Sequence, residues 1–158
     1  TCALPIYGYN VKYLHNEIGK ILGIDRENNL IVIGGGHLGQ AIANYANFER
    51  RGFYIKAIFD IDPEIIGKEV RGVRVYSMDE LEDFIKKNDI HIAALAIPKL
   101  QAEEVAKRLV AAGIVGIWNY AHIDLQVPDN VVVENVHLSE SLMRLSYRVN
   151  REMDKTKK

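Results

Sequence analysis

Residues 30–46, LIVIGGGHLGQAIANYA, restrict the fold more than any other part of the sequence. Branched apolar residues typical of a buried strand run directly into a glycine-rich turn, and a helical pattern follows. Gly34, Gly36 and Gly39 have the GxGxxG spacing, and they lie between a strand and a helix, as a dinucleotide-binding unit requires. The stretch therefore predicts the first strand–turn–helix unit of an α/β fold.

The same alternation continues along the chain. Short runs rich in Ile and Val predict buried parallel strands near residues 30–34, 54–59, 73–76, 91–97, 114–118 and 131–136. Between them, amphipathic runs predict helices near residues 37–51, 78–88 and 99–112. Ser77 and Glu80 have the spacing of a capping box, and Gly113 is typical of a helix C-cap. The predicted fold class is α/β, with a Rossmann-like, doubly wound, mostly parallel sheet.

Two amphipathic segments lie outside this alternation. Residues 11–23 predict a helix with an apolar stripe formed by Val11, Leu14, Ile18, Ile21 and Leu22. Near the C-terminus, apolar residues at spacings of 4, 3 and 4 form a second stripe: Leu138, Leu142, Leu145 and Val149. No later element follows to cover this second stripe, so the helix either packs on its own domain or enters a partner subunit.

These patterns divide the chain into three parts. Residues 1–24 form an N-terminal segment and linker helix, residues 25–137 form the Rossmann domain, and residues 138–158 form the C-terminal helix. The polar end of the last part, REMDKTKK, is expected to fray. The chain does not begin with Met, which indicates that a further segment precedes it in the full protein.

Composition excludes several classes of function. The 158 residues are 48% hydrophobic, enough for one sizeable core, and their formal net charge of −1 lacks the basic excess of a nucleic-acid-binding surface. This segment alone is therefore not expected to bind DNA strongly. Cys2 is the only cysteine, which excludes an internal disulfide and favours a reducing cytoplasm. No apolar run has the length of a membrane span.

The glycine turn has the features of a dinucleotide-binding site. Gly34 would permit the tight turn, Gly36 would let a pyrophosphate approach the backbone, and Gly39 would allow close packing of helix on sheet. The pyrophosphate would then lie at the free amides and the positive dipole end of the helix. The alternative is that the three glycines only tighten a strand-to-helix turn.

Asp60 extends this interpretation to the ribose. It ends the next predicted strand 21 residues after Gly39, close to the spacing expected for the acid that binds a ribose 2′-hydroxyl. A carboxylate here would repel a 2′-phosphate, and no Arg or Lys lies between Asp60 and Lys68 to attract one. The residues favour NAD(H) over NADP(H). The alternative is that Asp60 and Asp62 cap the following segment, PEIIG.

Two further stretches follow predicted strands and should lie at the same edge of the sheet. They are AIPK at residues 96–99 and WNYAH at residues 118–122. Ligands of open α/β sheets bind outside the carboxyl ends of the strands, so both are candidates for the nicotinamide half. The alternative is that Pro98 only starts a helix and Asn119 only shapes a turn.

Catalytic motifs are missing from the sequence. GxSxG, a P-loop lysine and HExxH are absent, and the five histidines show no metal-ligand spacing: His15, His37, His91, His122 and His137. A dehydrogenase also needs a substrate pocket and usually a second domain, for which few residues remain. We therefore expect no catalytic residue and no metal, and a sensor that holds a dinucleotide without transforming it.

The combination of motifs resembles one family, the redox-sensing transcriptional repressors of the Rex type. The similar stretches cover nearly the whole chain from Gly8: residues 8–14, 32–45, 59–76, 96–121 and 127–147. The resemblance implies a C-terminal NAD(H)-binding domain, with the N-terminal winged-helix reader of operator DNA absent from this segment. It also implies a cytoplasmic homodimer that exchanges its final helix, and NADH binding that favours release of operator DNA, which NAD⁺ does not.

The resemblance also carries site residues over by position. It implies that Tyr45 lies near the nicotinamide and that residue 137 of a partner subunit approaches Tyr45. Members of this family usually have Asp at position 137, Pro at 122 and Phe at 120, whereas this chain has His137, His122 and Tyr120. The full set of predicted cofactor-binding residues is Gly34, Gly35, Gly36, His37, Leu38, Gly39, Tyr45, Asp60, Ile61, Asp62, Ile97, Pro98, Asn119, Tyr120 and His137.

Three other functions are compatible with the same glycine turn. A CoA-binding domain of the succinyl-CoA ligase kind shares this fold, and a nucleotide-gating domain of a transporter would show a similar turn. Asp60 argues for a ribose diol, and the partner region of such a ligase is missing. The third alternative is a fragment of an NAD-dependent oxidoreductase.

Overall fold

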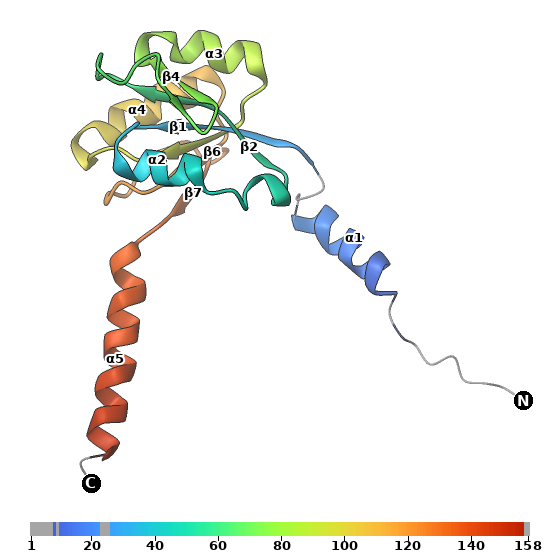
Figure 1. Ribbon diagram of the computed structural model, residues 1–158, viewed down its shortest axis with the longest axis vertical. Helices are drawn as coiled ribbons and strands as arrows, with labels where there is room; N and C mark the ends of the chain where they lie inside the picture. Colours follow the sequence, from blue (N-terminus) through green and yellow to red (C-terminus); the bar gives the residue numbers. More distant parts are fainter. Residues whose placement is uncertain (1–7, 9, 23–25, 157–158) are drawn as a thin grey trace, which may run out of the picture.

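The computed structural model of the protein describes residue 8 and residues 10–22 and 26–156 (Figure 1). The strands are β1 (Asn28–Ile33), β2 (Phe53–Asp60), β3 (Glu69–Val70), β4 (Val73–Ser77), β5 (Ile92–Leu95), β6 (Gly116–Asn119) and β7 (Val132–Asn135). The helices are α1 (Val11–Leu22), α2 (His37–Asn44), α3 (Leu81–Asn88), α4 (Lys99–Ala112) and α5 (Leu138–Thr156), with 3₁₀ turns η1 (Glu49–Arg51) and η2 (Met78–Glu80).

The strands form a single mostly parallel sheet in the order β3-β4-β2-β1-β5-β6-β7. The β3–β4 pair is antiparallel, and the other neighbouring pairs are parallel. The chain runs from β1 to β2 on one side and later returns to β5 on the other. This reversal creates a crevice at the carboxyl ends of β1 and β5, where open α/β sheets bind their ligands. The predicted fold class is confirmed.

The two faces of the sheet are covered unequally. Successive side chains of β1 point to opposite faces, so Ile31 and Ile33 pack with α3 and α4, whereas Val32 packs with α2. Because both faces of the central strands are buried, β1 is apolar without alternation, as its sequence predicted. On the α2 side, α2 is the only helix among the described residues that packs on the sheet.

The helix after the glycine turn is shorter than predicted. Its pattern suggested residues 37–51, but α2 ends at Asn44, and a turn and η1 follow. Asn residues favour such turns because their side chains compete for backbone hydrogen bonds. Phe48 leaves the helix to pack edge-on against Trp118 of β6, with 5.7 Å between the ring centroids. Tertiary packing therefore overrides the helical pattern beyond residue 44.

Strands β5 and β6 are displaced from their predicted limits. The strand predicted for residues 91–97 ends at Leu95, because Ile97 and Pro98 turn away to start α4. The strand predicted for residues 114–118 begins at Gly116. Ile114 and Gly113 are still needed to end α4, since their N–H groups donate to Leu109 and Val110 in a Schellman arrangement. The predicted limits of α4 are confirmed.

The predicted capping box is present before α3. The Ser77 hydroxyl accepts from the Asp79 N–H at 3.2 Å, and the Glu80 carboxylate accepts from the Ser77 N–H at 3.1 Å. The first turn after Ser77 is the 3₁₀ turn η2, and the α-helix starts only at Leu81. The β3–β4 hairpin, which the sequence analysis did not predict, precedes this cap.

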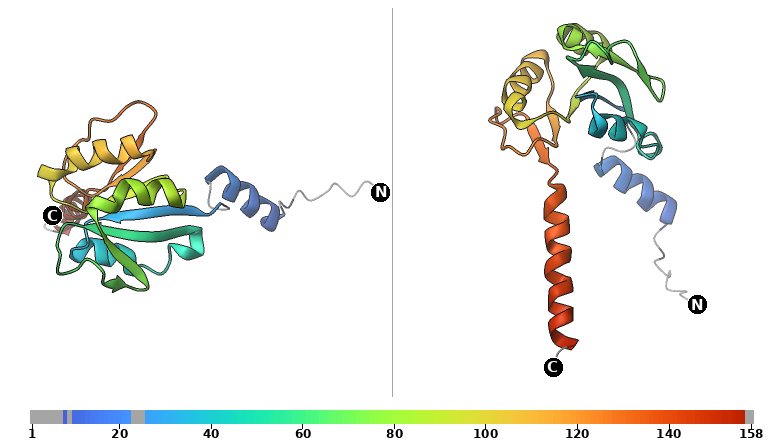
Figure 2. Two further views of the ribbon diagram at one scale, coloured as in Figure 1. Left: turned by 90° about the horizontal axis from the view of Figure 1, so that it is seen from above. Right: turned by 60° about the vertical axis from the view of Figure 1, so that its left-hand side comes forward.

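The terminal helices α1 and α5 project from the core (Figures 1 and 2). Their apolar stripes are exposed, and Leu138, Leu142 and Leu145 are 64%, 67% and 56% accessible. The helix α5 continues to Thr156, so residues 151–156 of the polar end are helical in this structure. Cys2, Gly23 and the last two residues lie outside the described part. Neither α1 nor α5, nor any other described helix, could cross a membrane.

One polar side chain is buried between the last two strands. Asn119 is 1% accessible, and its amide nitrogen donates to the carbonyl oxygen of Ile123 and to the side chain of Asn135, both at 2.8 Å. Its amide oxygen accepts from the Ala121 N–H at 3.0 Å. This side chain therefore ties β6, the following turn and β7 together.

We expect Asn119→Ala to destabilise the protein by about 2–4 kcal/mol, because it removes three hydrogen bonds, including the one that satisfies the buried Ala121 N–H. Urea unfolding followed by circular dichroism would measure this loss. Asn135→Ala is the matched control, since it removes one bond at an exposed residue and should cost about 1 kcal/mol or less. Equal stabilities of the two variants would contradict the assigned role.

Candidate functional site

The glycine turn lies at the carboxyl end of β1 and is closely packed. Gly34 has φ of +100°, and a Cβ at this position would collide with the carbonyl oxygen of Ala96 after β5. A Cβ at Gly39 would overlap the carbonyl oxygen of Gly34. Both positions therefore need glycine for the turn and for the approach of α2, in agreement with the structural roles predicted from their spacing.

Gly36 differs from these two glycines. It is exposed, and a Cβ built on it would meet no heavy atom of the described residues within 4 Å. It also precedes α2 without a side-chain cap, so the first amides of the helix are open to an external acceptor. The protein's own packing does not require glycine at this position, whereas a group bound over the turn would.

Asp60 ends β2 beside the turn and is held by backbone donors. Its Oδ2 atom accepts from the Gly35 N–H at 2.6 Å, and its Oδ1 atom accepts from the Asp62 N–H at 2.8 Å. A carboxylate oxygen can accept more than one hydrogen bond, so both oxygens keep capacity for a ligand hydroxyl. Asp60 therefore fixes the glycine turn and also presents a charge at its edge.

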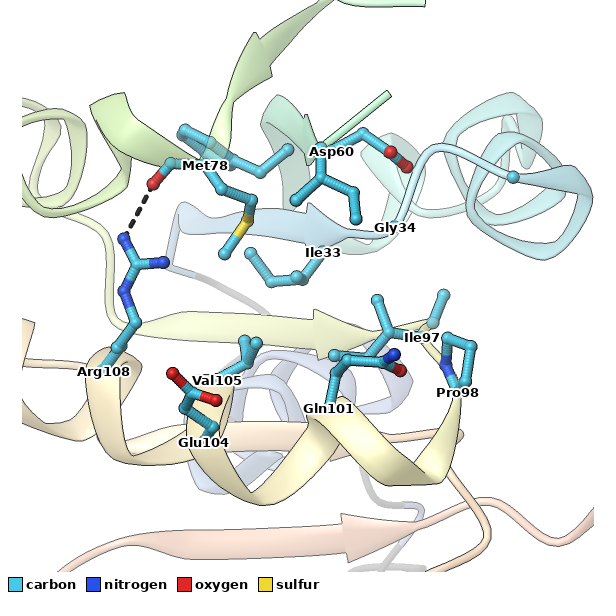
Figure 3. Close-up of a pocket in the computed structure, with 14 residues that line it drawn as sticks. Ile33, Gly34, Asp60, Met78, Ile97, Pro98, Gln101, Glu104, Val105 and Arg108 are labelled. Atoms are coloured by element: carbon cyan, nitrogen blue, oxygen red, sulfur yellow. Dashed lines mark hydrogen bonds between the residues drawn. The ribbon is translucent and has the colours of Figure 1, made fainter. Parts of the chain in front are cut away.

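A cleft of about 450 Å³ opens beside the turn, between η2 and α4 (Figure 3). Six of the predicted site residues line it: Gly34, Gly36, Asp60, Ile61, Ile97 and Pro98. The structure thus brings together the glycine turn, the acid at the end of β2 and the segment after β5, as their places at strand ends predicted.

Eight other lining residues were not predicted: Ile33, Phe59, Met78, Ala96, Gln101, Glu104, Val105 and Arg108. Four of them lie on one face of α4 at helical spacing: Gln101, Glu104, Val105 and Arg108. They could have been predicted by continuing the helix from Pro98 and marking the residues that share its face. The remaining four come from strand ends and from the capped turn at Met78, and no motif in the sequence connects them.

Arg108 closes the inner end of the cleft. Its Nε and Nη2 atoms donate to the two carboxylate oxygens of Glu82 at 2.8 and 3.0 Å, and Nη2 also donates to the carbonyl oxygen of Met78. The hydrogen bond with Arg108 lowers the pKa of Glu82, and the same bond raises the pKa of Arg108. The pair therefore fixes the guanidinium in place between α4 and α3.

The other predicted residues lie outside the cleft, and three of them have structural roles beside it. Gly35 is buried, Gly39 packs under the turn, and the Asp62 carboxylate accepts from the Glu64 N–H at 2.9 Å. This last bond matches the alternative interpretation, in which Asp62 caps the next segment. His37 and Leu38 are exposed in the first turn of α2.

The predicted nicotinamide residues are spread over several elements. Tyr45, at the end of α2, is 54% accessible and packs on Phe48. Tyr120 packs on Trp118, and burial raises the pKa of its phenol. The side chain of Asn119 holds the β6–β7 turn, as the structural alternative described, and its contact with the nicotinamide stays a prediction.

The two unusual histidines meet in space. The rings of His122, after β6, and His137, before α5, have centroids 6.2 Å apart and planes inclined by 22°. This pairing was not visible in the sequence, because fourteen residues lie between the two positions. Among the described residues, no three histidine, cysteine or acidic side chains are grouped closely enough to hold a metal ion.

Comparison with known proteins identifies relatives along most of the chain. Residues 25–123 match the family model of the CoA binding domain. The chain is 60% identical to the redox-sensing transcriptional repressor Rex of Clostridioides difficile, over 89% of this chain and 67% of the relative. It is 56% identical to the Rex repressor of Thermoanaerobacter sp., over 92% of this chain and 65% of the relative. It thus spans about two thirds of the length of these proteins.

Solved structures agree with these relatives. The crystal structure of RSP, a Rex-family repressor, has a TM-score of 0.90 at 53% identity and covers 98% of this chain and 74% of that one. RSP in complex with β-NADH has a TM-score of 0.88, and RSP with β-NAD⁺ and operator DNA has a TM-score of 0.87. The sequence relatives and the fold lead to the same conclusion: the chain belongs to the Rex family of redox-sensing transcriptional repressors.

Proposed function

We propose that this chain is the NAD(H)-sensing regulatory part of a redox-responsive transcriptional repressor, in which NADH binding favours release of operator DNA. The observation that carries the proposal is the cleft at the carboxyl ends of β1 and β5, where exposed Gly36 and the carboxylate of Asp60 lie together. The complexes of RSP with β-NADH and with β-NAD⁺ and operator DNA support it.

The residues of the cleft fit a dinucleotide. The pyrophosphate would lie over Gly36, where there is room for it and where the amides and dipole of α2 attract an anion. Asp60 would accept hydrogen bonds from the adenosine ribose, and the apolar wall of the cleft would hold the base. The nicotinamide would extend past Pro98 towards Tyr45 and Tyr120, with His137 supplied by a second copy of the chain.

A regulatory role fits this site better than a catalytic one. The relatives are named as repressors, and the ionisable groups described in the cleft are Asp60, Glu104 and Arg108, of which Asp60 and Arg108 already hold the fold. Operator DNA would be read by a further domain of the full-length protein, in the cytoplasm where the DNA lies, since this segment has no basic excess.

The exposed stripe on α5 supports a homodimer. An apolar groove of about 340 Å³ lies at the starts of the strands, beside Phe48 and Trp118. Exchange of α5 between two copies would cover Leu138, Leu142 and Leu145, and each buried side chain would contribute roughly 1.5–3 kcal/mol. This arrangement would also bring residue 137 of one copy towards the site of the other.

Isothermal titration calorimetry with NADH, NAD⁺, NADPH and coenzyme A tests the proposal on this chain. Binding of NADH in preference to NADPH and coenzyme A supports an NAD(H) sensor. Preferential binding of coenzyme A would instead favour the function named in the family model, the CoA binding domain. Binding of none of the four ligands would refute the proposed site.

For the pyrophosphate, we expect Gly36→Val to abolish detectable NADH binding while the protein stays folded. The new side chain has space in the protein itself but would occupy the volume over the first amides of α2. Circular dichroism would check the fold, and calorimetry would check binding. Gly39→Val is the contrasting control, because its side chain collides with the turn and should prevent folding. Unchanged NADH affinity in folded Gly36→Val would disprove the placement.

The preference for NAD(H) should depend on Asp60. We expect Asp60→Ala to weaken NADH binding and to narrow the ratio between NADH and NADPH affinities, since the carboxylate favours ribose hydroxyls and repels a 2′-phosphate. The variant also loses the bond to the Gly35 N–H, so the ratio of affinities is the decisive measurement. An unchanged ratio would remove Asp60 from the ribose site.

The dimer should depend on the apolar stripe of α5. We expect sedimentation equilibrium to show a dimer of the parent chain and monomers or aggregates of the Leu142→Glu, Leu145→Glu double variant. The control is Ser139→Glu, which places one such glutamate on α5 outside the apolar stripe. A monomeric parent chain would overturn the exchange of α5.

A further inference from the structure

The inner half of the cleft contains polar groups beyond those that a pyrophosphate and a ribose would use. Glu104 and Arg108 lie on the cleft face of α4, six and ten residues after Pro98. With a helical rise of about 1.5 Å per residue, they lie about 9 and 15 Å further along the helix. A nucleotide with its phosphates at the glycine turn would therefore direct its base towards these two residues.

Arg108 offers a fixed donor at this place. Its Nε and Nη2 atoms are used by Glu82 and by the carbonyl oxygen of Met78. Its Nη1 atom makes no hydrogen bond within the described part of the chain, and Figure 3 shows the guanidinium beside the cleft. Because the other nitrogens are already held, the donor is oriented before any ligand arrives.

Glu104 offers a neighbouring acceptor. In Figure 3 its side chain points from α4 into the cleft, between Arg108 and Gln101. It makes no hydrogen bond or ion pair with any described residue, so both carboxylate oxygens are available. Its charge is close enough to Arg108 to contribute to the raised pKa of the guanidinium, after the larger effects of Glu82 and Asp79. A fixed donor and a free acceptor thus lie side by side.

We propose that Glu104 and Arg108 read the purine base of the bound dinucleotide and select a 6-aminopurine over a 6-oxopurine. The inference rests on the proposed NAD(H) site. The carboxylate of Glu104 accepts from the exocyclic amine of adenine, and the Nη1 atom of Arg108 donates to a ring nitrogen. In the same orientation a 6-oxopurine reverses both positions: its oxo group faces the carboxylate of Glu104, and its N1–H faces the Nη1 donor of Arg108, so both contacts become repulsive.

The arrangement also argues against selection of a 6-oxopurine by Arg108. Two-pronged recognition of such a base needs two free guanidinium donors side by side. Here Glu82 and Met78 hold Nε and Nη2, which leaves a single nitrogen facing the ligand. An apolar wall alone, formed by Met78 and Val105, would discriminate poorly between bases of the same shape. Selectivity therefore depends on Glu104.

Nicotinamide hypoxanthine dinucleotide in its reduced form is the probe, because it differs from NADH by a 6-oxo group in place of the 6-amino group. Calorimetric titration of the whole chain should show binding at least about tenfold weaker than that of NADH. Glu104→Gln should bring the two affinities within about threefold, since an amide can accept from the amine or donate to the oxo group.

Glu103→Gln is the matched control. Glu103 is the preceding residue of α4, lies outside the cleft and accepts from the Gln126 N–H, so its variant should keep the parent ratio. Equal affinities of the parent chain for the two dinucleotides, or an unchanged ratio in Glu104→Gln, would overturn base reading while leaving the NAD(H) site intact. Failure of the parent chain to bind NADH would overturn both proposals.

Discussion

The steric contact between Gly34 and Gly39 determines where everything else in the site lies. A side chain at either position would collide with backbone, at the carbonyl oxygen of Ala96 or of Gly34 itself. Because Gly34 and Gly39 carry no side chains, α2 can start directly over the end of β1 and beside the end of β5. The amides of α2 consequently face the crevice, and the Gly35 N–H reaches Asp60 on the next strand. The turn, the acid and the segment after β5 become one surface through this contact.

The unequal cover of the sheet gives the second constraint. α3 and α4 enclose one face around a large apolar cluster, whereas α2 covers only part of the other. The uncovered part contains aromatic side chains, and α5 carries an exposed apolar stripe that no described residue of its own chain covers. A monomer would leave both surfaces in water, at a considerable cost in free energy. In the proposed dimer, α5 of one copy would cover the open part of the sheet in the other, so both apolar surfaces would be buried.

The two ends of the cleft are built by different parts of the fold. The glycine turn and Asp60 would bind any NAD(H), while the inner end is built by α4 and by the capped turn at Met78. The ion pair of Glu82 with Arg108 joins these two elements and fixes one donor at the end of the cleft. Affinity and base selectivity would thus be set by different residues, which can vary independently.

The sequence by itself determined the α/β class, the glycine turn, the limits of α4 and the acid at residue 60, because these depend on local spacing and on strand, cap and turn preferences. It also predicted an apolar stripe on the last helix, to be covered either by its own domain or by a partner subunit. Only the tertiary structure decided that α2 ends at Asn44, where Phe48 leaves to pack on Trp118.

Long-range contacts decided the rest of the site as well. Asn119 was predicted only from its place at a strand end, and the packing of β7 beside β6 also gives its side chain partners in Asn135 and Ile123. The meeting of His122 with His137 and of Glu82 with Arg108 likewise joins residues distant in sequence. Such pairs cannot be predicted from local sequence patterns, because the partners are brought together only when the sheet and its helices assemble.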